Sequence, residues 1–500
     1  MAARGVNWSR VVADGGRDRD RSGGAPSVTP ATGADPRRCG CAGKTPLDRV
    51  VLPARDRVAA ALDGTSVRLG PDTDAAILRG SAGVDPVDRE VDTVALGEEQ
   101  PAAPFAGDGG GAPVVTLACV FVGDDLADPD ALGDALATAY AGLDGPDVTI
   151  GKGHAVQIPD LDGGVLWLEH LRRGDSENDC DRDGATDSDR DGGEANAGRA
   201  GGASGTASAG FVAANVDAVH AFPDLTPPEQ ARIAALNACN DVYAVGATAD
   251  RVVRPVVASP AGVDPPASQA TDWYRAGIPA EVSVLPASVL GHGGESWLLG
   301  ASVTARGGVD PTEPPLPDDC GVLLTRPLGG LAAFALGHID GDRGLRELGR
   351  DRLTGDARPV AEALAACRPE PDEPFDPARH LARVTDVSGE GIGGVGRLVA
   401  RDGRSLRLDR LPFLPGVADA AAGGWTIPDA TVETNGPFAA IGTPSALARA
   451  SERLRSVEGA DPVRIGTLDR GDAPIRDATG GDPVQFVEAA ARWPAAGEER

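Results

Sequence analysis

Three polar side chains interrupt an apolar run in the middle of the sequence. The run at 235–246 reads Ala-Leu-Asn-Ala-Cys-Asn-Asp-Val-Tyr-Ala-Val-Gly, and the interruptions are Asn237, Asn240 and Asp241. Burying such groups unpaired costs roughly 1–3 kcal/mol each, so each needs a hydrogen-bond partner or a ligand. The run is typical of a helix whose polar residues either cap its own end or face a binding site.

Two cysteines and a lysine lie close together at the end of a Gly-rich and Arg-rich N-terminal arm. The stretch 37–44 reads Arg-Arg-Cys-Gly-Cys-Ala-Gly-Lys, which places Cys39 and Cys41 near Lys44. A cation beside a thiol favours the thiolate, which is the form that acts as a nucleophile. Such a thiol could serve as a nucleophile. The alternative is an inert, exposed Cys-x-Cys pair.

Single carboxylates stand at three further places where apolar runs begin or end. Asp74 precedes Ala-Ala-Ile, Asp217 ends a strand-like run at 211–217, and Asp386 follows Val-Thr. Mg²⁺ takes a few carboxylates and leaves room for phosphate oxygens. The carboxylate cluster at Asp74 therefore suits a Mg²⁺ site. For Asp74 the alternative is an ordinary Asp-rich turn.

The stretch 237–246 resembles Asn-Ala-x-x-Asp-x-Tyr-Ala-Met-Gly, a signature of the selenophosphate synthetases (selenide, water dikinases) in the AIR-synthase-like superfamily of ATP-using enzymes. The arm is similar to the family's mobile Cys-Gly-Cys-Lys segment, with two residues inserted before the lysine. The resemblance implies that Cys39 is the reactive position and Lys44 the catalytic lysine. It also implies that Asp241 binds metal and that Asn237 lies beside the phosphates.

Further matches follow in the family's order. Asp74 matches the second Asp of Asp-Asp-Ala-Ala-Val, Asp217 ends a counterpart of Thr-Thr-Asp, and Asp386 lies in a counterpart of Thr-Asp-Val-Thr-Gly-Phe-Gly. Thr434 lies in a remnant of Gln-Thr-Ser-Gly-Gly. The resemblance therefore implies that Asp74, Asp241 and Asp386 bind metal, and that Asp217, Asn237 and Thr434 contact the nucleotide.

The sequence also departs from the family pattern. Arg326 replaces a lysine, Glu390 a phenylalanine and Val395 a histidine, and the loop around His292 fits its counterpart poorly. This drift leaves two alternatives open. One is another small-molecule kinase or synthase of the superfamily, which would not need Cys39. The other is a nucleotide-binding regulatory protein that has lost turnover.

The resemblance implies that ATP, selenide and water react to give selenophosphate, AMP and phosphate, with Mg²⁺ as cofactor. It implies an α/β (α+β) AIR-synthase-like fold, with an N-terminal mixed-sheet, half-barrel domain and a C-terminal α-β sandwich domain. It also implies a homodimer built through the N-terminal domains.

We predict an arm at 1–44, an N-terminal domain at 45–310 with an insertion at about 81–209, and a C-terminal domain at 311–490. The acidic, low-complexity segment 174–209 reads as a disordered part of this insertion.

The 500 residues carry a net charge of −28, and nearly all of the positive charge is arginine. We interpret this composition as adaptation to high salt, where a Debye length of about 3 Å near 1 M screens self-repulsion. The same balance disfavours nonspecific nucleic-acid binding, which needs a basic face. The sequence shows neither a long apolar span nor a secretory signal, so we predict a cytoplasmic protein with no membrane partner.

Apolar patterning predicts alternating strands and helices. The strands are expected at 67–69, 114–122, 148–158, 211–217, 252–257, 281–285, 300–305 and 463–468, and the helices at 47–62, 130–143, 227–240, 267–277, 331–349, 359–368 and 446–457. The stretch 81–112 reads as a polar connection. A GxGxxG at 389–394 lacks the context of a dinucleotide site, and 151–154 lacks the spacing of a P-loop.

Overall fold

The computed structural model describes most of the chain, namely residues 34–45, 47–70, 75–79, 84–96, 113–143, 148–150, 154–158, 161, 163–173, 210–417, 431–471 and 474–477. The predictions made for Asp74, for residues 1–33 of the arm and for the acidic segment 174–209 lie outside these residues.

Strands from the first third of the chain form one sheet, which we call the outer sheet. Its order is β1-β5-β4-β7-β3, with β6 beside β4. The strands are β1 (Val67–Leu69), β3 (Val84–Leu96), β4 (Val115–Val122), β5 (Val148–Ile150), β6 (His154–Gln157) and β7 (Gly164–Arg173). Helices α1 (Leu52–Ala61) and α2 (Pro129–Ala141) pack against one of its faces. The Asp128 side chain accepts hydrogen bonds from two backbone N–H groups and so caps the start of α2.

A second sheet, which we call the inner sheet, has the order β10-β9-β12-β8-β2, with β11 beside β9. Its strands are β2 (Ala76–Arg79), β8 (Phe211–His220), β9 (Ala247–Ser259), β10 (Ser283–Val284), β11 (Ser288–Gly291) and β12 (Leu298–Gly307). Helices α3 (Pro227–Ala244) and α4 (Ala267–Gly277) cover the face that points away from the outer sheet. A capping box between Thr226 and Glu229 begins α3.

The C-terminal sheet has the order β14-β16-β13-β17-β15-β18. Its strands are β13 (Gly321–Leu324), β14 (Arg383–Asp386), β15 (Arg404–Leu408), β16 (Phe438–Gly442), β17 (Val463–Arg470) and β18 (Ile475–Asp477). Its helices are α5 (Gly330–Ile339), α6 (Arg343–Thr354), α7 (Arg358–Ala365), α8 (Gly391–Ala400) and α10 (Pro444–Leu454). Helix α8 packs on one face, while α7 and α10 cover the other.

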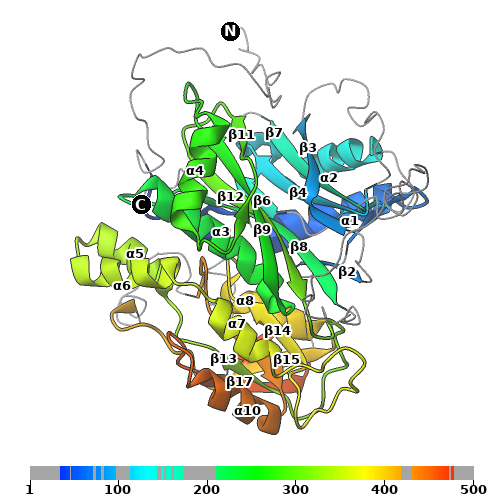
Figure 1. Cartoon of the computed structure of the whole chain (residues 1–500), viewed down its shortest axis with the longest axis vertical. Helices are drawn as coiled ribbons and strands as arrows, with labels where there is room; N and C mark the ends of the chain where they lie inside the picture. Colours follow the sequence, from blue (N-terminus) through cyan, green and yellow to red (C-terminus); the bar gives the residue numbers. More distant parts are fainter. Residues whose placement is uncertain are drawn as a thin grey trace, which may run out of the picture.

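The N-terminal part therefore has four layers: α1 and α2, the outer sheet, the inner sheet, and α3 and α4. Helix α3 is buried on almost every side because the inner sheet lies on one side and C-terminal elements lie on the other. Figure 1 shows the C-terminal part below the N-terminal layers. This arrangement confirms the predicted α/β class, with a mixed-sheet N-terminal part followed by an α/β C-terminal part. The proposed domain boundaries stay predictions.

Several predicted elements differ from those in the structure. The polar connection predicted at 81–112 is wrong in its first half, because β3 occupies Val84–Leu96. Its charged residues hid the strand pattern, and Arg89 is buried only because partners from other strands surround it. The helix predicted at 331–349 is two helices, α5 and α6, which a turn at Gly341 with φ of 72° separates. The strand predicted at 148–158 is likewise two strands, β5 and β6.

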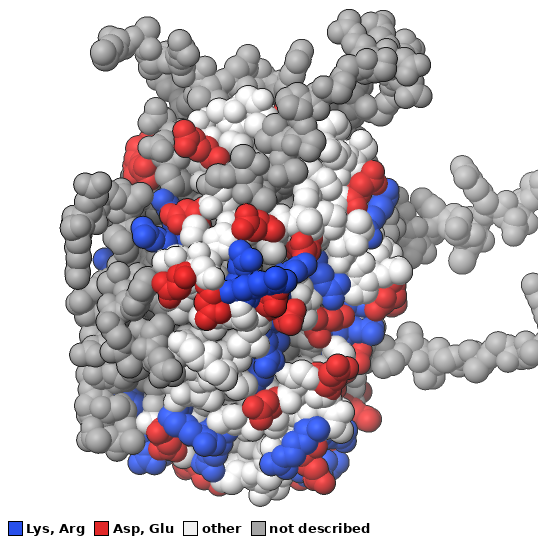
Figure 2. Space-filling view, turned by 90° about the vertical axis from the view of Figure 1, so that its left-hand side faces the viewer, with Lys and Arg blue, Asp and Glu red and all other residues white. Residues whose placement is uncertain are grey.

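No helix in the described part of the chain is long and apolar enough to cross a membrane. On the face shown in Figure 2, the acidic and basic side chains of the described residues are interspersed, with a small basic cluster bordered by acidic residues.

Candidate functional site

The end of the arm lies between the inner sheet and the C-terminal part. Gly40 and His220, at the end of β8, exchange two backbone hydrogen bonds of 2.9 and 3.2 Å. The backbone of Gly40 has a φ of 62°, and a Cβ there would lie 2.3 Å from the Thr434 hydroxyl oxygen. Only glycine fits both conditions without strain. At Gly40 the arm is therefore in close contact with both the inner sheet and the C-terminal part.

Lys44 forms a buried ion pair with Asp217. Its Nζ lies 2.5 and 2.6 Å from the two carboxylate oxygens. The side chain of Asp217 is 2 % exposed and that of Lys44 is 13 % exposed. Burial alone would lower the pKa of Lys44, but Asp217 and other nearby acidic groups more than offset this and hold it above its usual value. The ammonium ion is therefore charged at every physiological pH.

Asn237, on α3, joins this pair to the rest of the site. Its Nδ2 donates to Asp217 at 2.6 Å, and its Oδ1 accepts a bond of 2.9 Å from the backbone N–H of Asn435. The Cys41 thiol donates to the same Oδ1 at 3.6 Å. Asn237, which was predicted to face a ligand, thus bridges the inner sheet, the arm and the loop at 431–437, which we call the C-terminal loop.

Cys41 lies inside this network. Its backbone N–H donates to the Thr434 hydroxyl at 2.8 Å. Burial, opposed by Lys44 and reinforced by Asp217, raises the pKa of the Cys41 thiol to about 11. The thiol is therefore protonated near neutral pH in this arrangement.

Cys39 lies outside the network. It is fully buried, and its Sγ donates to the carbonyl oxygen of Pro36 at 3.2 Å. The expectation that neighbouring cations favour its thiolate is wrong. Burial and then the charge of Asp35 raise the pKa of Cys39 well above its usual range.

Asp241 and Asp386, the other two predicted site carboxylates that the structure describes, lie close enough to influence the pKa of Lys44 and of Cys41 respectively. Asp241 accepts a bond of 2.6 Å from Asn215 and contributes to the raised pKa of Lys44. Asp386, at the end of β14, is 8 % exposed and contributes to the raised pKa of Cys41. The structure therefore brings Lys44, Asp217, Asn237, Asp241, Asp386 and Thr434 into one region.

Sequence reasoning gave no role to Asn435, which fixes the C-terminal loop. Its φ of 52° is left-handed, and its side chain donates to the carbonyl oxygens of Leu353 and Gly355 at 2.8 Å each. Its Oδ1 accepts from Asn240 at 3.0 Å. The Thr-Asn-Gly sequence was a usable signal, because Asn tolerates the left-handed region better than most residues.

Glu433 anchors the same loop to the C-terminal part. Its carboxylate accepts hydrogen bonds from the backbone N–H groups of Gly329, Gly330 and Leu331, at the start of α5. A negative charge is favoured at a helix N-terminus, which explains how a buried carboxylate is tolerated there. Glu433 thereby holds Thr434 in position to reach Cys41.

The predicted magnesium ligands are not assembled as a complete set. Among the described residues, no group of three His, Cys, Asp or Glu side chains could hold a metal ion. Lys44 and Asn237 occupy the Asp217 carboxylate, and Asp74 lies outside the described residues. Magnesium binding by Asp74, Asp241 and Asp386 therefore stays a prediction.

Two other motifs have structural explanations. His292 is buried, its Nδ1 accepts from the backbone N–H of Gly294 at 3.1 Å, and burial lowers its pKa to about 4. The GxGxxG at 389–394 leads from β14 into α8, but β14 pairs with β16 in an antiparallel ladder. The parallel βαβ unit of a dinucleotide site is absent at this strand pair.

No protein-family model and no curated protein sequence matches this chain. Among solved structures, it is similar to tt0281 from Thermus thermophilus, with 15% identity and a TM-score of 0.42 over 55% of this chain and 88% of that one. It is similar to the HypE-HypF complex, with 14% identity and a TM-score of 0.41 over 54% of this chain and 88% of that one. It is also similar to thiamine monophosphate kinase from Aquifex aeolicus, with 12% identity and a TM-score of 0.40 over 54% of this chain and 89% of that one.

Proposed function

We propose that this protein is an ATP-dependent phosphoryl-transfer enzyme of the AIR-synthase-like superfamily, and that its acceptor is selenide. ATP, selenide and water would give selenophosphate, AMP and phosphate. Two P–O bonds of the triphosphate break, one P–Se bond forms, and the oxygen of water enters the released phosphate. The three phosphorus atoms of ATP are all accounted for in the products.

One observation carries the proposal. Residues selected from motifs in four distant segments belong to one hydrogen-bond network: Lys44 on the arm, Asp217 on β8, Asn237 on α3, and Thr434 on the C-terminal loop. Cys41 completes the connection between Asn237 and Thr434. Such convergence is unexpected if the motif matches were chance resemblances.

The network contains what phosphoryl transfer requires of a protein. Transfer depends mostly on positioning and on stabilising charge at the phosphoryl oxygens. Lys44 supplies a permanent positive charge on a short arm segment that can exchange Asp217 for a phosphate. Asn237 and Thr434 supply neutral polar groups that can orient the triphosphate.

The geometry favours Cys41 over Cys39 as the thiol that meets the acceptor. Cys41 stands three residues before Lys44, which is the spacing between the reactive Cys and the Lys in Cys-Gly-Cys-Lys. Cys39 instead faces the carbonyl oxygen of Pro36. We therefore assign to Cys41 the role that the sequence suggested for Cys39.

Magnesium is compatible with the residues present. Mg²⁺ is commonly held by one or two carboxylates together with substrate phosphates. Asp241 and Asp386 would provide these carboxylates, and the ion would neutralise charge on the phosphates. The chain's own contribution is to hold both carboxylates in the region of Lys44 and Cys41.

The test is ³¹P NMR of the purified protein in molar KCl with Mg²⁺, ATP and selenide under anaerobic, reducing conditions. We expect a selenide-dependent selenophosphate signal together with AMP. ATP conversion to ADP regardless of selenide would overturn the selenide assignment in favour of another small-molecule kinase. ATP binding without turnover would favour a regulatory protein.

A further inference from the structure

Two stretches of the chain follow the same path. The first is β4-α2-β5-β6-β7, and the second is β9-α4-β10-β11-β12. In each, the two short strands after the helix pair in parallel with the first strand, and the last strand pairs with it in antiparallel. In each, an earlier strand, β3 or β8, pairs in antiparallel with the last strand.

The residue pairing within the two sheets also matches. Counted back from the strand's last residue, Val115 on β4 and Val252 on β9 occupy the same position, and they pair with Thr149 and Ser283 respectively. The next parallel strand begins at His154 opposite Cys119 in the outer sheet, and at Ser288 opposite Val256 in the inner sheet. These are again equivalent positions. A shared register is much more specific than a shared order of elements, because a slip of one residue reverses every side chain.

The same register identifies the counterpart of Asp217. In the inner sheet, Asp217 pairs with Ala301, which pairs with Pro255. In the outer sheet, Asp92 pairs with Leu168, which pairs with Ala118. Ala118 and Pro255 lie at the same distance from the ends of β4 and β9. Asp92 therefore occupies the place of Asp217, and each lies on the helix-covered face of its sheet.

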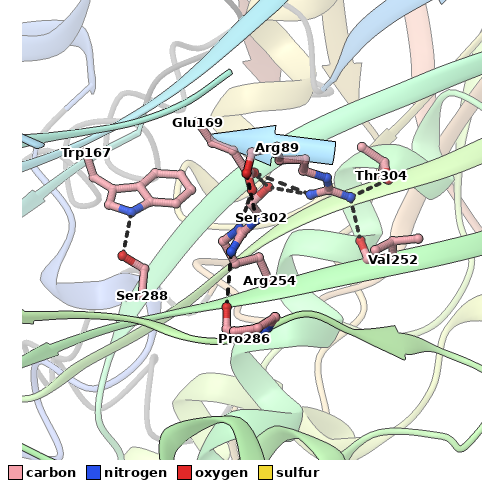
Figure 3. Close-up of polar contacts among 9 residues, drawn as sticks. All are labelled: Arg89, Trp167, Glu169, Val252, Arg254, Pro286, Ser288, Ser302 and Thr304. Atoms are coloured by element: carbon pink, nitrogen blue, oxygen red, sulfur yellow. Dashed lines mark hydrogen bonds and ion pairs between the residues drawn. The ribbon is translucent and has the colours of Figure 1, made fainter. Parts of the chain in front are cut away.

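The two sheets meet through their other faces. Alternate residues of β4 and β7 share one apolar core with residues of β8 and β9. Within this core, the fully buried Glu169 on β7 contacts Arg89 on β3 and Arg254 on β9, with closest distances of 3.4 and 2.6 Å. It also accepts a hydrogen bond from Ser302 on β12, and Trp167 donates to Ser288 at 3.0 Å across the same junction. Figure 3 shows these contacts joining strands of both sheets.

The surroundings of Asp92 differ from those of Asp217. His170 Nε2 lies 3.2 Å from Asp92, and its Nδ1 lies 2.8 Å from the Thr116 hydroxyl. His170, which contacts Asp92, and Thr116, which contacts His170, therefore both come from the same sheet as Asp92. Only residues 97–114 connect β3 to β4, whereas 221–246 connect β8 to β9 and include the whole of α3. Among the residues that the structure describes, no counterpart of α3 follows β3, and α1 packs on α2.

We propose that residues 84–173 are a second, degenerate copy of the unit 211–307 and serve as its built-in partner. The inner sheet then buries its open face against the same chain, and the homodimer implied by the sequence resemblance is not needed. Because, among the described residues, only the inner copy carries α3 and with it Asn237 and Asp241, each chain holds one site. The count of nucleotide sites rests on the proposed function, whereas the repeat and its consequence for assembly do not.

The first test is the mass of the wild-type protein in molar KCl, measured by light scattering across a hundredfold range of concentration. We expect a monomer of 50.6 kDa throughout. A stable dimer would overturn the inference. Titration with ATP and Mg²⁺ should then give one site per chain, and two sites would overturn the assignment of the outer copy as degenerate. Absence of ATP binding would count against the proposed function, while the mass still decides the built-in partner.

The second test compares matched variants at the two equivalent positions. Asp217→Asn should reduce ATP turnover at least a hundredfold, because it removes the partner of Lys44. Asp92→Asn should leave turnover within about twofold and ATP stoichiometry unchanged. A hundredfold loss in Asp92→Asn, with an unchanged circular dichroism spectrum, would show that the outer copy also carries a working site.

Discussion

Two buried ionic clusters lie on opposite faces of the inner sheet, and they are held in different ways. Toward the outer sheet, Glu169, Arg89 and Arg254 all come from strands whose ladders fix their positions. Toward α3, Asp217 comes from a strand, but its cation, Lys44, comes from the arm. The first cluster is closed by paired strands, whereas the second depends on a residue outside the sheets and helices. Stability should therefore depend more on the first, and activity on the second.

The largest expected effect is loss of stability in Glu169→Ala. Removing one member of a buried ionic cluster leaves uncompensated charge and costs about 3–5 kcal/mol. Here two arginines would lose their shared carboxylate. Denaturant unfolding in molar KCl should show this loss. The matched control is Glu90→Gln on the same sheet, because Glu90 is half-exposed and pairs with Arg172 at the surface. Equal losses of unfolding free energy in Glu169→Ala and Glu90→Gln would contradict the prediction that the buried cluster matters more for stability than the surface pair.

The next effect is loss of activity in Lys44→Ala. Removing a positioned charge from a phosphoryl-transfer site costs roughly 10²–10³-fold in rate. Asp217 keeps its hydrogen bond from Asn237, so the free energy of unfolding should fall less than in Glu169→Ala. Steady-state kinetics with ATP and selenide would measure the rate. Activity within tenfold of wild type would remove Lys44 from the mechanism.

A smaller effect should distinguish the two cysteines of the arm. Cys41→Ser should reduce selenide-dependent turnover about 10–100-fold, because the weakly nucleophilic hydroxyl replaces the thiol beside Lys44. Cys39→Ser should cost less, since Cys39 faces Pro36 rather than the network. Both rates should be measured at the same selenide concentration. The reverse order would restore the role that the sequence suggested for Cys39.

The smallest effect concerns the pH dependence of stability. The pKa of Cys41 is raised to about 11 in the folded state, above its unfolded value near 9. Between these values the unfolded state loses a proton that the folded state keeps, so stability falls as pH rises, by up to roughly 1.4 kcal/mol per pH unit for this group. Cys41→Ala should reduce this slope between pH 9 and pH 11. Identical slopes in the two proteins would show that Cys41 is not the group responsible.

Much of the candidate site could be found from sequence because its residues stand in locally unusual contexts. Asn237 and Asp241 interrupt an apolar helix, Asp217 lies in an apolar strand, and Lys44 is a lysine in a chain that mostly uses arginine. Burial makes each of these polar groups need a partner wherever the chain goes. Asn435 was missed because its importance lies in contacts with three distant segments.

The choice between the arm cysteines could not be made from sequence. Both stand near cations along the chain, and the sequence suggested Cys39. The three-dimensional path turns Cys41 toward Asn237 and Cys39 toward Pro36. At both thiols burial outweighs the neighbouring cations and raises the pKa. A pKa depends on every charge and every layer of atoms around the group, most of which are remote in sequence.

Most local elements and most polar residues of the site follow from the sequence alone, because periodicity, capping and the cost of burying polar groups act over a few residues. The roles of β3 and β7 emerge only in three dimensions. The charged residues of β3 read as a polar connection, but Arg89 meets Thr304 of the inner sheet. Glu169 on β7 likewise meets Arg254 of the inner sheet. A buried charge is stable only with its partner, and strands far apart along the chain supply that partner here. The segment predicted as an insertion, at about 81–209, therefore supplies strands that share one apolar core with the inner sheet.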